Sequence, residues 1–174
     1  MRKLGLIGGM SWYSSETYYN RINKQVVRRT NGSCNAPLVM ESLNFCDIKQ
    51  ATTEQDWDNV SEVLIASAKR LEEAGATAIL VCANSMHKVH DRVAAAVSVP
   101  VIHIADAVGT KMKAAGVQSA ALLGTSNVMA ENWYRQRLVK HGVTLLPAEM
   151  DDVKDLDRII YDELLGRADL TLIG

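Results

Sequence analysis

The chain has 174 residues and a formal net charge of −1, and 48% of its residues are hydrophobic. These values exclude a disordered chain and leave room for one domain or two small ones with a buried core. Because the net charge is near zero, the chain has no excess of basic residues that would attract nucleic acid or an acidic membrane surface. We therefore predict neither partner. Because the apolar stretches are short, we also predict no membrane-spanning segment.

Three cysteines, Cys34, Cys46 and Cys82, are scattered along the chain without close pairs. This spacing favours reduced thiols in the cytoplasm over a disulfide framework or a zinc site. The N-terminal sequence MRKLGLIGGM reaches Gly-Gly after only a few apolar residues, so it predicts a first strand and not a signal peptide.

Short apolar runs alternate with helical patterns along the chain. The predicted strands span residues 3–8, 37–43, 76–82, 99–104, 119–125, 143–147 and 170–173. The predicted helices span residues 14–29, 58–74, 105–115, 127–141 and 152–165. Strands that are apolar throughout indicate burial on both faces, which predicts an α/β fold with parallel sheets flanked by helices. We place the boundary between two sub-domains after residue 100, giving 1–100 and 101–174.

Parallel sheets of this kind bind ligands at the carboxyl ends of their strands. The first such loop, within GLIGGMSWYSS (5–15), has a Gly-Gly turn, and Ser14 or Ser15 can cap the next helix. Its backbone N–H groups favour a carboxylate or a phosphate. It matches neither G-x-G-x-x-G nor a P-loop, and an ordinary turn without ligand is an equally open interpretation.

The second loop lies in VCANSMHKVH (81–90). The Cys82 thiol needs a lowered pKa to act as a base or nucleophile, and Asn84 and Ser85 can donate hydrogen bonds to a carboxylate. The alternative is that Cys82 is the inert, buried last residue of the strand. His87 and His90 are one helical turn apart without a third ligand, so we predict no metal and expect solvated or capping histidines.

The third loop, within LLGTSNV (122–128), places Thr125 and Ser126 between a strand and a helix. They predict either a second anion site or an ordinary helix cap.

Together and in this order, several segments resemble the aspartate/glutamate racemase family, in particular its bacterial amino-acid racemase branch. These segments are GLIGGMSW (5–12), YYNRIN (18–23), CANSMHKV (82–89), PVIHIADA (100–107), ALLGT (121–125) and IIYDEL (159–164). The resemblance implies two similar α/β sub-domains with the active site between them, a small amino acid as substrate, and commonly a homodimer. It also implies racemisation without a cofactor, in which two bases, normally cysteines, act on opposite faces of the α-carbon.

The resemblance assigns substrate contacts to the glycine loop, to the loop after the second strand and to the second site loop. It also assigns one to the third loop, which would line the opposing side of the substrate. The implied substrate-binding residues are Met10, Ser11, Thr52, Ala83, Asn84, Ser85 and Thr125. Of these, Asn84 and Ser85 would hold the α-carboxylate.

Three features depart from the family pattern. The catalytic cysteine of a C-N-T motif is replaced by Ala83, and Cys82 stands one place earlier, where successive strand residues point in opposite directions. Cys82 is therefore the candidate catalytic residue, with a partner such as His87 or a group from a second subunit. The sequence ends at L-T-L-I-G, where a G-C-T-E-type motif would bring the second cysteine, so we expect a shortened second sub-domain. Tyr13 replaces a glutamate common after GGMSW.

Three functions follow as hypotheses. The first is a cofactor-independent amino-acid racemase, and the second is a truncated or degenerate relative that keeps the fold and amino-acid binding without turnover. The third and weakest is a module that binds a phosphate-bearing ligand at the Gly-Gly loop.

Overall fold

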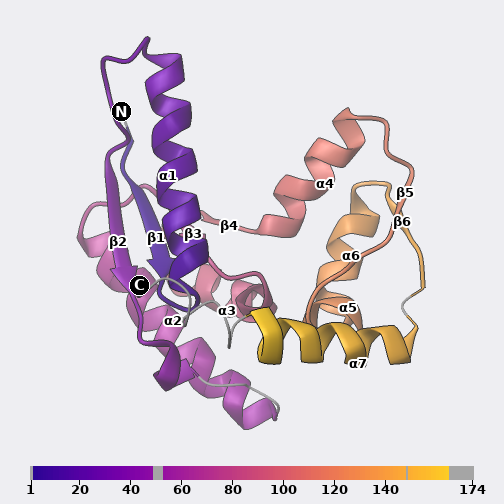
Figure 1. Cartoon of the computed structure of the whole chain (residues 1–174). Coiled ribbons are helices and arrows are strands. Elements are labelled where there is room, and N and C mark those ends of the chain that lie inside the picture. The colour runs from indigo at the N-terminus through magenta and orange to yellow at the C-terminus, as the bar shows by residue number, and fades with distance from the viewer. Residues whose placement is uncertain (1, 49–52, 148, 165–174) are drawn as a thin grey trace, which may run out of the picture. The chain divides into compact units, whose positions relative to one another are not determined.

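The computed structural model describes residues 2–48, 53–147 and 149–164 of the chain (Figure 1). The chain divides into two compact units, Met1–His103 and Ile104–Gly174. Strand β4 (Val101–Ile102) pairs with β3 (Ala78–Val81) in the sheet of the first unit. The first unit therefore continues through His103, three residues beyond the boundary that we placed after residue 100.

The first unit is built on a four-stranded parallel sheet in the order β2-β1-β3-β4. Strand β1 (Leu4–Gly8) pairs with β2 (Leu38–Ser42) on one side and with β3 on the other. All residues of β1 after Leu4 are buried. This burial agrees with the continuous apolar pattern of the strand, since helices cover a central parallel strand on both faces.

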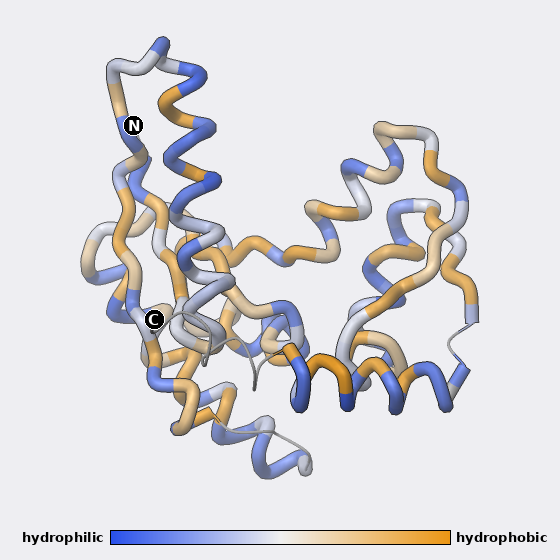
Figure 2. Tube along the Cα trace, in the orientation of Figure 1, coloured by the Kyte–Doolittle hydropathy of each residue, from blue (hydrophilic) through white to orange (hydrophobic). Residues whose placement is uncertain are grey.

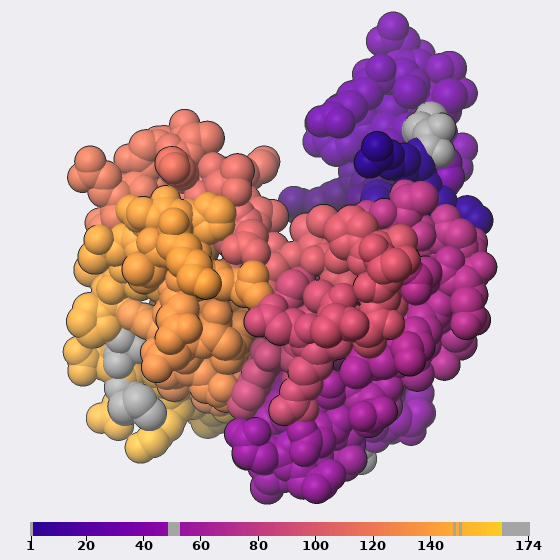
Figure 3. Space-filling view, turned by 180° about the vertical axis from the view of Figure 1, so that it is seen from behind, coloured from indigo at the N-terminus to yellow at the C-terminus, as the bar shows by residue number. Residues whose placement is uncertain are grey.

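Helices flank this sheet on both sides. Helix α1 (Trp12–Arg29) lies along one face, and α2 (Glu54–Glu73) and α3 (His90–Ala95) cover the other (Figure 1). Figure 3 shows the face of α2 and α3 from behind as a closely packed surface in magenta to pink. Two 3₁₀ helices, Phe45–Ile48 and Ser85–Val89, were absent from the sequence prediction.

The core of the first unit lies mainly between the sheet and α2. Buried apolar side chains from β1, α2, β3 and the segment before β4 form one cluster, which includes Ile7, Trp57, Leu64, Ile79 and Val93. Helix α1 contributes only Ser15 to the buried residues, and its tube is mostly hydrophilic with short apolar stretches (Figure 2). The two faces of the sheet therefore differ in how much apolar surface their helices bury.

The second unit has less regular structure. Its helices are α4 (Ile104–Ala114), α5 (Ser126–Met129), α6 (Asn132–Lys140) and α7 (Met150–Arg158), which continues as a π-helix over Ile159–Leu164. Its strands, β5 (Ser119–Ala120) and β6 (Thr144–Leu145), form a two-stranded parallel sheet. A small core of Ala105, Val128, Tyr134 and Leu138 joins α4, α5 and α6.

The predicted fold class, mixed α/β with parallel sheets flanked by helices, is confirmed. One predicted helix, 127–141, is wrong as a single element: Glu131 has an extended backbone (φ −87°, ψ 152°) and separates α5 from α6. The predicted strand at 170–173 lies outside the described residues. Among the residues that are described, no helix is both long and apolar enough to span a bilayer.

Candidate functional site

The first and second site loops meet at the point where the sheet reverses its strand order. With the order β2-β1-β3-β4, the connections that leave β1 and β3 turn to opposite faces of the sheet, and ligands bind at such a point. The Cys82 amide donates to the Ile7 carbonyl at 2.9 Å. The Ser14 hydroxyl donates to the Cys82 carbonyl at 2.7 Å. The fold thus brings together two loops that lie about seventy positions apart in the sequence.

The first loop is held by hydrogen bonds from its own helix. The Ser15 hydroxyl oxygen accepts from the Gly9 amide at 2.9 Å, and the hydroxyl donates to the Ser11 carbonyl at 3.0 Å. Gly9 has φ +82°, a left-handed conformation that glycine adopts without strain. The expected cap at Ser14 or Ser15 is wrong, because α1 begins one turn earlier, with Ser11 at the N-cap position and no capping bond from its side chain.

The predicted substrate contacts in this loop differ in accessibility. Met10 is buried and belongs to the core of the first unit, whereas Ser11 is half-buried. The Gly9 amide already donates to Ser15, so one backbone donor of the expected anion site serves the turn itself. The predicted contact Thr52 lies outside the described residues.

The second loop begins with a buried thiol. The side chain of Cys82 is 1% exposed, and burial raises its pKa to about 12. The group is therefore a neutral thiol near neutral pH. Ala83, at the position that the family resemblance makes catalytic, is half-buried and carries no ionisable group. Asn84 is exposed and Ser85 half-buried, so this part of the loop is open to a ligand.

The histidines of the second loop are buried, so of the two expected states, solvated or capping, the solvated one is wrong. His87 is 2% exposed and His90 is 8% exposed. Between them packs His103, 3% exposed, with its ring centroid 4.8 Å from that of His87 and 4.7 Å from that of His90. Sequence reasoning gave His103 no role, since it lies within a predicted strand (99–104) and no pattern pairs it with the histidines of the second loop.

The ring nitrogens of His87 and His90 bond to the protein itself. The His87 Nδ1 lies 3.0 Å from the Ala83 carbonyl oxygen and 3.1 Å from that of Asn84. The His90 Nε2 lies 2.9 Å from the carbonyl oxygen of Val101. Within the described ranges, no group of three histidine, cysteine or carboxylate side chains is placed to hold a metal ion.

The third loop belongs to the second unit, and its helix start is already capped. Thr125 precedes α5, and its hydroxyl oxygen is buried with no hydrogen-bond partner among the described residues. The Ser126 amide donates to one carboxylate oxygen of Asp157 at 2.9 Å, and its hydroxyl donates to the other at 3.2 Å. The sequence left two interpretations of this loop open, a second anion site or an ordinary helix cap. In the structure, the Asp157 carboxylate of the chain itself lies at this helix start.

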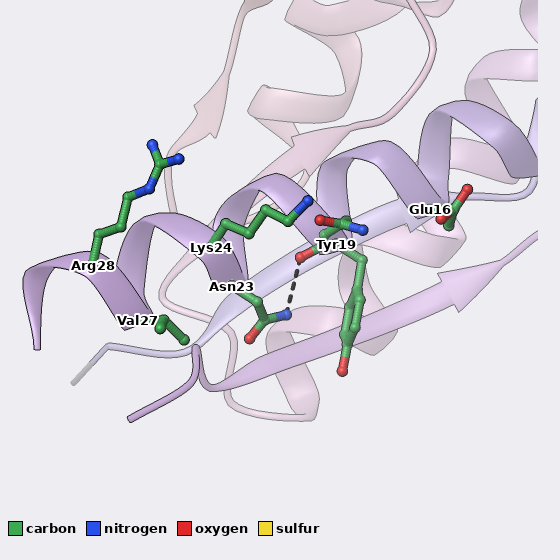
Figure 4. Close-up of a pocket in the computed structure, with 7 residues that line it drawn as sticks. Glu16, Tyr19, Asn23, Lys24, Val27 and Arg28 are labelled. Carbon is green, nitrogen blue, oxygen red and sulfur yellow. Dashed lines mark hydrogen bonds between the residues drawn. The ribbon is translucent and has the colours of Figure 1, made fainter. Parts of the chain in front are cut away.

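A surface hollow of about 630 Å³ lies along one stripe of α1 (Figure 4). Asn23, on this stripe, donates to the Tyr19 carbonyl at 2.9 Å and accepts from the Ala36 amide at 3.0 Å. The polar atoms of Asn23 therefore serve the fold. The lining residues are Glu16, Tyr19, Asn20, Asn23, Lys24, Val27 and Arg28.

Comparison with known proteins places the chain in a family. A structure from Yersinia pestis, described as a candidate Asp/Glu racemase, is 42% identical with a TM-score of 0.87, and the match covers 95% of this chain and 73% of that one. An aspartate racemase homologue from Pyrococcus horikoshii is 33% identical with a TM-score of 0.78 and the same coverage. The aspartate racemase of Picrophilus torridus shares the fold at 15% identity, with a TM-score of 0.67 and coverage of 97% of this chain and 77% of that one. The family model for Asp/Glu/hydantoin racemases matches residues 7–171, and the chain belongs to this family.

Proposed function

We propose that the protein is a cofactor-independent amino-acid racemase that acts on aspartate, glutamate or a related small amino acid. The observation that carries this proposal is the meeting of the two site loops at the strand-order reversal of the first sheet, where Cys82 is hydrogen-bonded to β1 and to α1. Family membership supplies the reaction class. The substrate comes from the names of the similar structures from Yersinia pestis and Pyrococcus horikoshii.

The proposed chemistry is proton exchange at the α-carbon. Asn84 and Ser85 would hold the α-carboxylate and stabilise the negative charge that develops when the α-proton leaves. Because Cys82 is a thiol near neutral pH, its proposed part is to return a proton to the carbanion and become a thiolate. A base on the opposite face removes the original α-proton. Thr52 and Thr125 remain proposed substrate contacts, and a homodimer remains the proposed assembly.

A second candidate is a relative that binds an amino acid without turning it over. Two observations favour it: Ala83 has no proton to exchange, and the Cys82 thiol is buried within the first unit. In this candidate the same loops hold the ligand, but no ionisable group reaches the α-carbon.

One experiment separates the two candidates. The protein is incubated in D₂O with each enantiomer of aspartate and glutamate, loss of the α-proton signal is followed by NMR, and calorimetry measures binding. A racemase exchanges the α-proton, and Cys82→Ala abolishes the exchange whereas Cys46→Ala, at an exposed thiol, does not. Binding without exchange would leave the second candidate, and absence of both binding and exchange would overturn both.

A further inference from the structure

The imidazole of His87 makes two hydrogen bonds to the backbone of the second site loop. Its Nδ1 lies within hydrogen-bond distance of both the Ala83 and the Asn84 carbonyl oxygens, at 3.0 and 3.1 Å. Carbonyl oxygens only accept hydrogen bonds, so Nδ1 carries the proton and donates to both. Burial lowers the pKa of His87 to about 4, so the ring is neutral near neutral pH.

These bonds fix the orientation of two consecutive peptide planes. In a trans peptide the C=O of one residue and the N–H of the next point in opposite directions, and the structure has no cis peptide bond among its described residues. Because the Ala83 and Asn84 carbonyls point toward the buried ring, the amide N–H groups of Asn84 and Ser85 point away from it. Asn84 itself is exposed and Ser85 is half-buried.

The ring itself is anchored to the neighbouring strand. His87 packs against His103, the residue after β4, with ring centroids 4.8 Å apart. His103 in turn packs against His90, which bonds to the Val101 carbonyl at 2.9 Å. The cluster of His87, His90 and His103 therefore ties the loop after β3 to β4.

We propose that His87 is the positioning residue of the second site loop: it turns the Ala83 and Asn84 carbonyls inward, so that the Asn84 and Ser85 amides face the substrate carboxylate. The inference rests on the proposed function for the identity of the bound group. His87 does not touch the substrate and acts only through the backbone that it holds.

The test replaces the donor and keeps the rest of the cluster. His87→Leu removes Nδ1, whereas His87→Asn places an amide nitrogen near the position of Nδ1. His90→Leu is the matched control, because it removes a buried imidazole of the same cluster that lies within hydrogen-bond distance of the Val101 carbonyl oxygen and the Asp91 carboxylate. Calorimetry measures the binding of L-aspartate and of D-aspartate. Hydrogen exchange of the Asn84 and Ser85 amides is measured in the free protein.

We expect His87→Leu to weaken aspartate binding about tenfold, with His87→Asn and His90→Leu within about threefold of the wild type. We also expect the Asn84 and Ser85 amides to exchange faster in His87→Leu alone. Wild-type binding and exchange in a folded His87→Leu protein would overturn the proposal, as would an equal loss in His90→Leu. If the wild-type protein binds neither enantiomer, the proposed function fails, and amide exchange by itself still decides the positioning role.

If His87→Leu does not fold, His87→Asn is compared with His87→Gln, whose amide lies one methylene farther from the backbone. Faster exchange of the two loop amides in His87→Gln than in His87→Asn supports the role. Equal exchange in the two variants overturns it.

Discussion

The two units of the chain specify their loops in different ways. In the first unit, β1 is buried between α1 and α2, and the turn that follows it is closed by Ser15 and by the Leu43 amide, which donates to the Gly8 carbonyl at 2.9 Å. In the second unit, the strands are two residues long and the third site loop depends on one carboxylate, that of Asp157. A deep sheet core fixes backbone positions through many contacts, whereas a small core leaves a loop to single polar interactions.

The largest expected effect tests the crowding of the first unit. Gly9 and Gly142 share φ +82°, but a Cβ on Gly9 would lie 2.0 Å from the Leu43 carbonyl oxygen, while a Cβ on Gly142 meets nothing within 4 Å. Gly9→Ala should lower the free energy of unfolding by on the order of 4 kcal/mol, from backbone strain plus steric overlap. Gly142→Ala, the control, should cost about 1 kcal/mol from φ alone. If urea titrations showed that the two variants lose the same free energy of unfolding, the turn after β1 would be no more crowded than the turn at Gly142.

The second effect is a pH dependence that belongs to the first unit. The folded-state pKa of His87 is about 4, below the ordinary value of 6.5, so the unfolded chain binds the extra proton between these pH values. Stability is therefore complete above about pH 6.5 and falls by about 3 kcal/mol as the pH drops to 4. Urea titrations across this range should show that His87→Asn loses this slope.

Glu41 contributes at more acidic pH in the same unit. The hydrogen bond from Arg70 lowers the pKa of the Glu41 carboxyl, so the stabilisation that this carboxylate gives is lost only as the pH falls below the ordinary pKa range of a glutamate.

The difference between the stability curves of the wild-type and His87→Asn proteins isolates the contribution of the imidazole. A wild-type slope that persists in His87→Asn would assign the dependence to other groups.

A smaller effect tests the single carboxylate of the second unit. Asp157→Ala removes the acceptor for the Ser126 amide and hydroxyl, and should cost about 1 kcal/mol, the usual value of a helix cap. Hydrogen exchange should show faster exchange of the α5 amides, and unchanged exchange of the amides in β1 and β3. Ser126→Ala, which keeps the amide bond, is the control and should have the smaller effect.

The smallest effect concerns the thiols, all three of which lie in the first unit. Cys34 and Cys46 are exposed and Cys82 is buried, so an alkylating reagent should label two of the three in the native protein. Mass spectrometry of the labelled peptides should find Cys82 modified only when the core of the first unit opens in urea. Rapid labelling of Cys82 in the native protein would contradict its burial, the property that distinguishes it from Cys34 and Cys46.

The fold class and the positions of the loops at the strand ends could be predicted, because they depend on local pattern. Apolar runs that alternate with helical patterns predicted parallel strands. β1 ends at Gly8 as predicted, and β3 ends at Val81, one residue before the predicted end at Cys82. The state of individual side chains could not be predicted in this way. The histidine pair at 87 and 90 gave no sign of burial, since the third ring, His103, comes from the segment after β4 and only packing brings it there.

The sequence by itself determined the family, the parallel architecture and the residue types at the strand ends, since these are written in contiguous motifs. Only the tertiary structure decided what those residues can do. Burial keeps the Cys82 thiol protonated, Asp157 takes the cap position at Ser126, and His87 bonds to the loop that carries Asn84. Each of these depends on a partner or on a degree of burial that local pattern does not encode, because solvent access and long-range contacts arise only when the chain has folded.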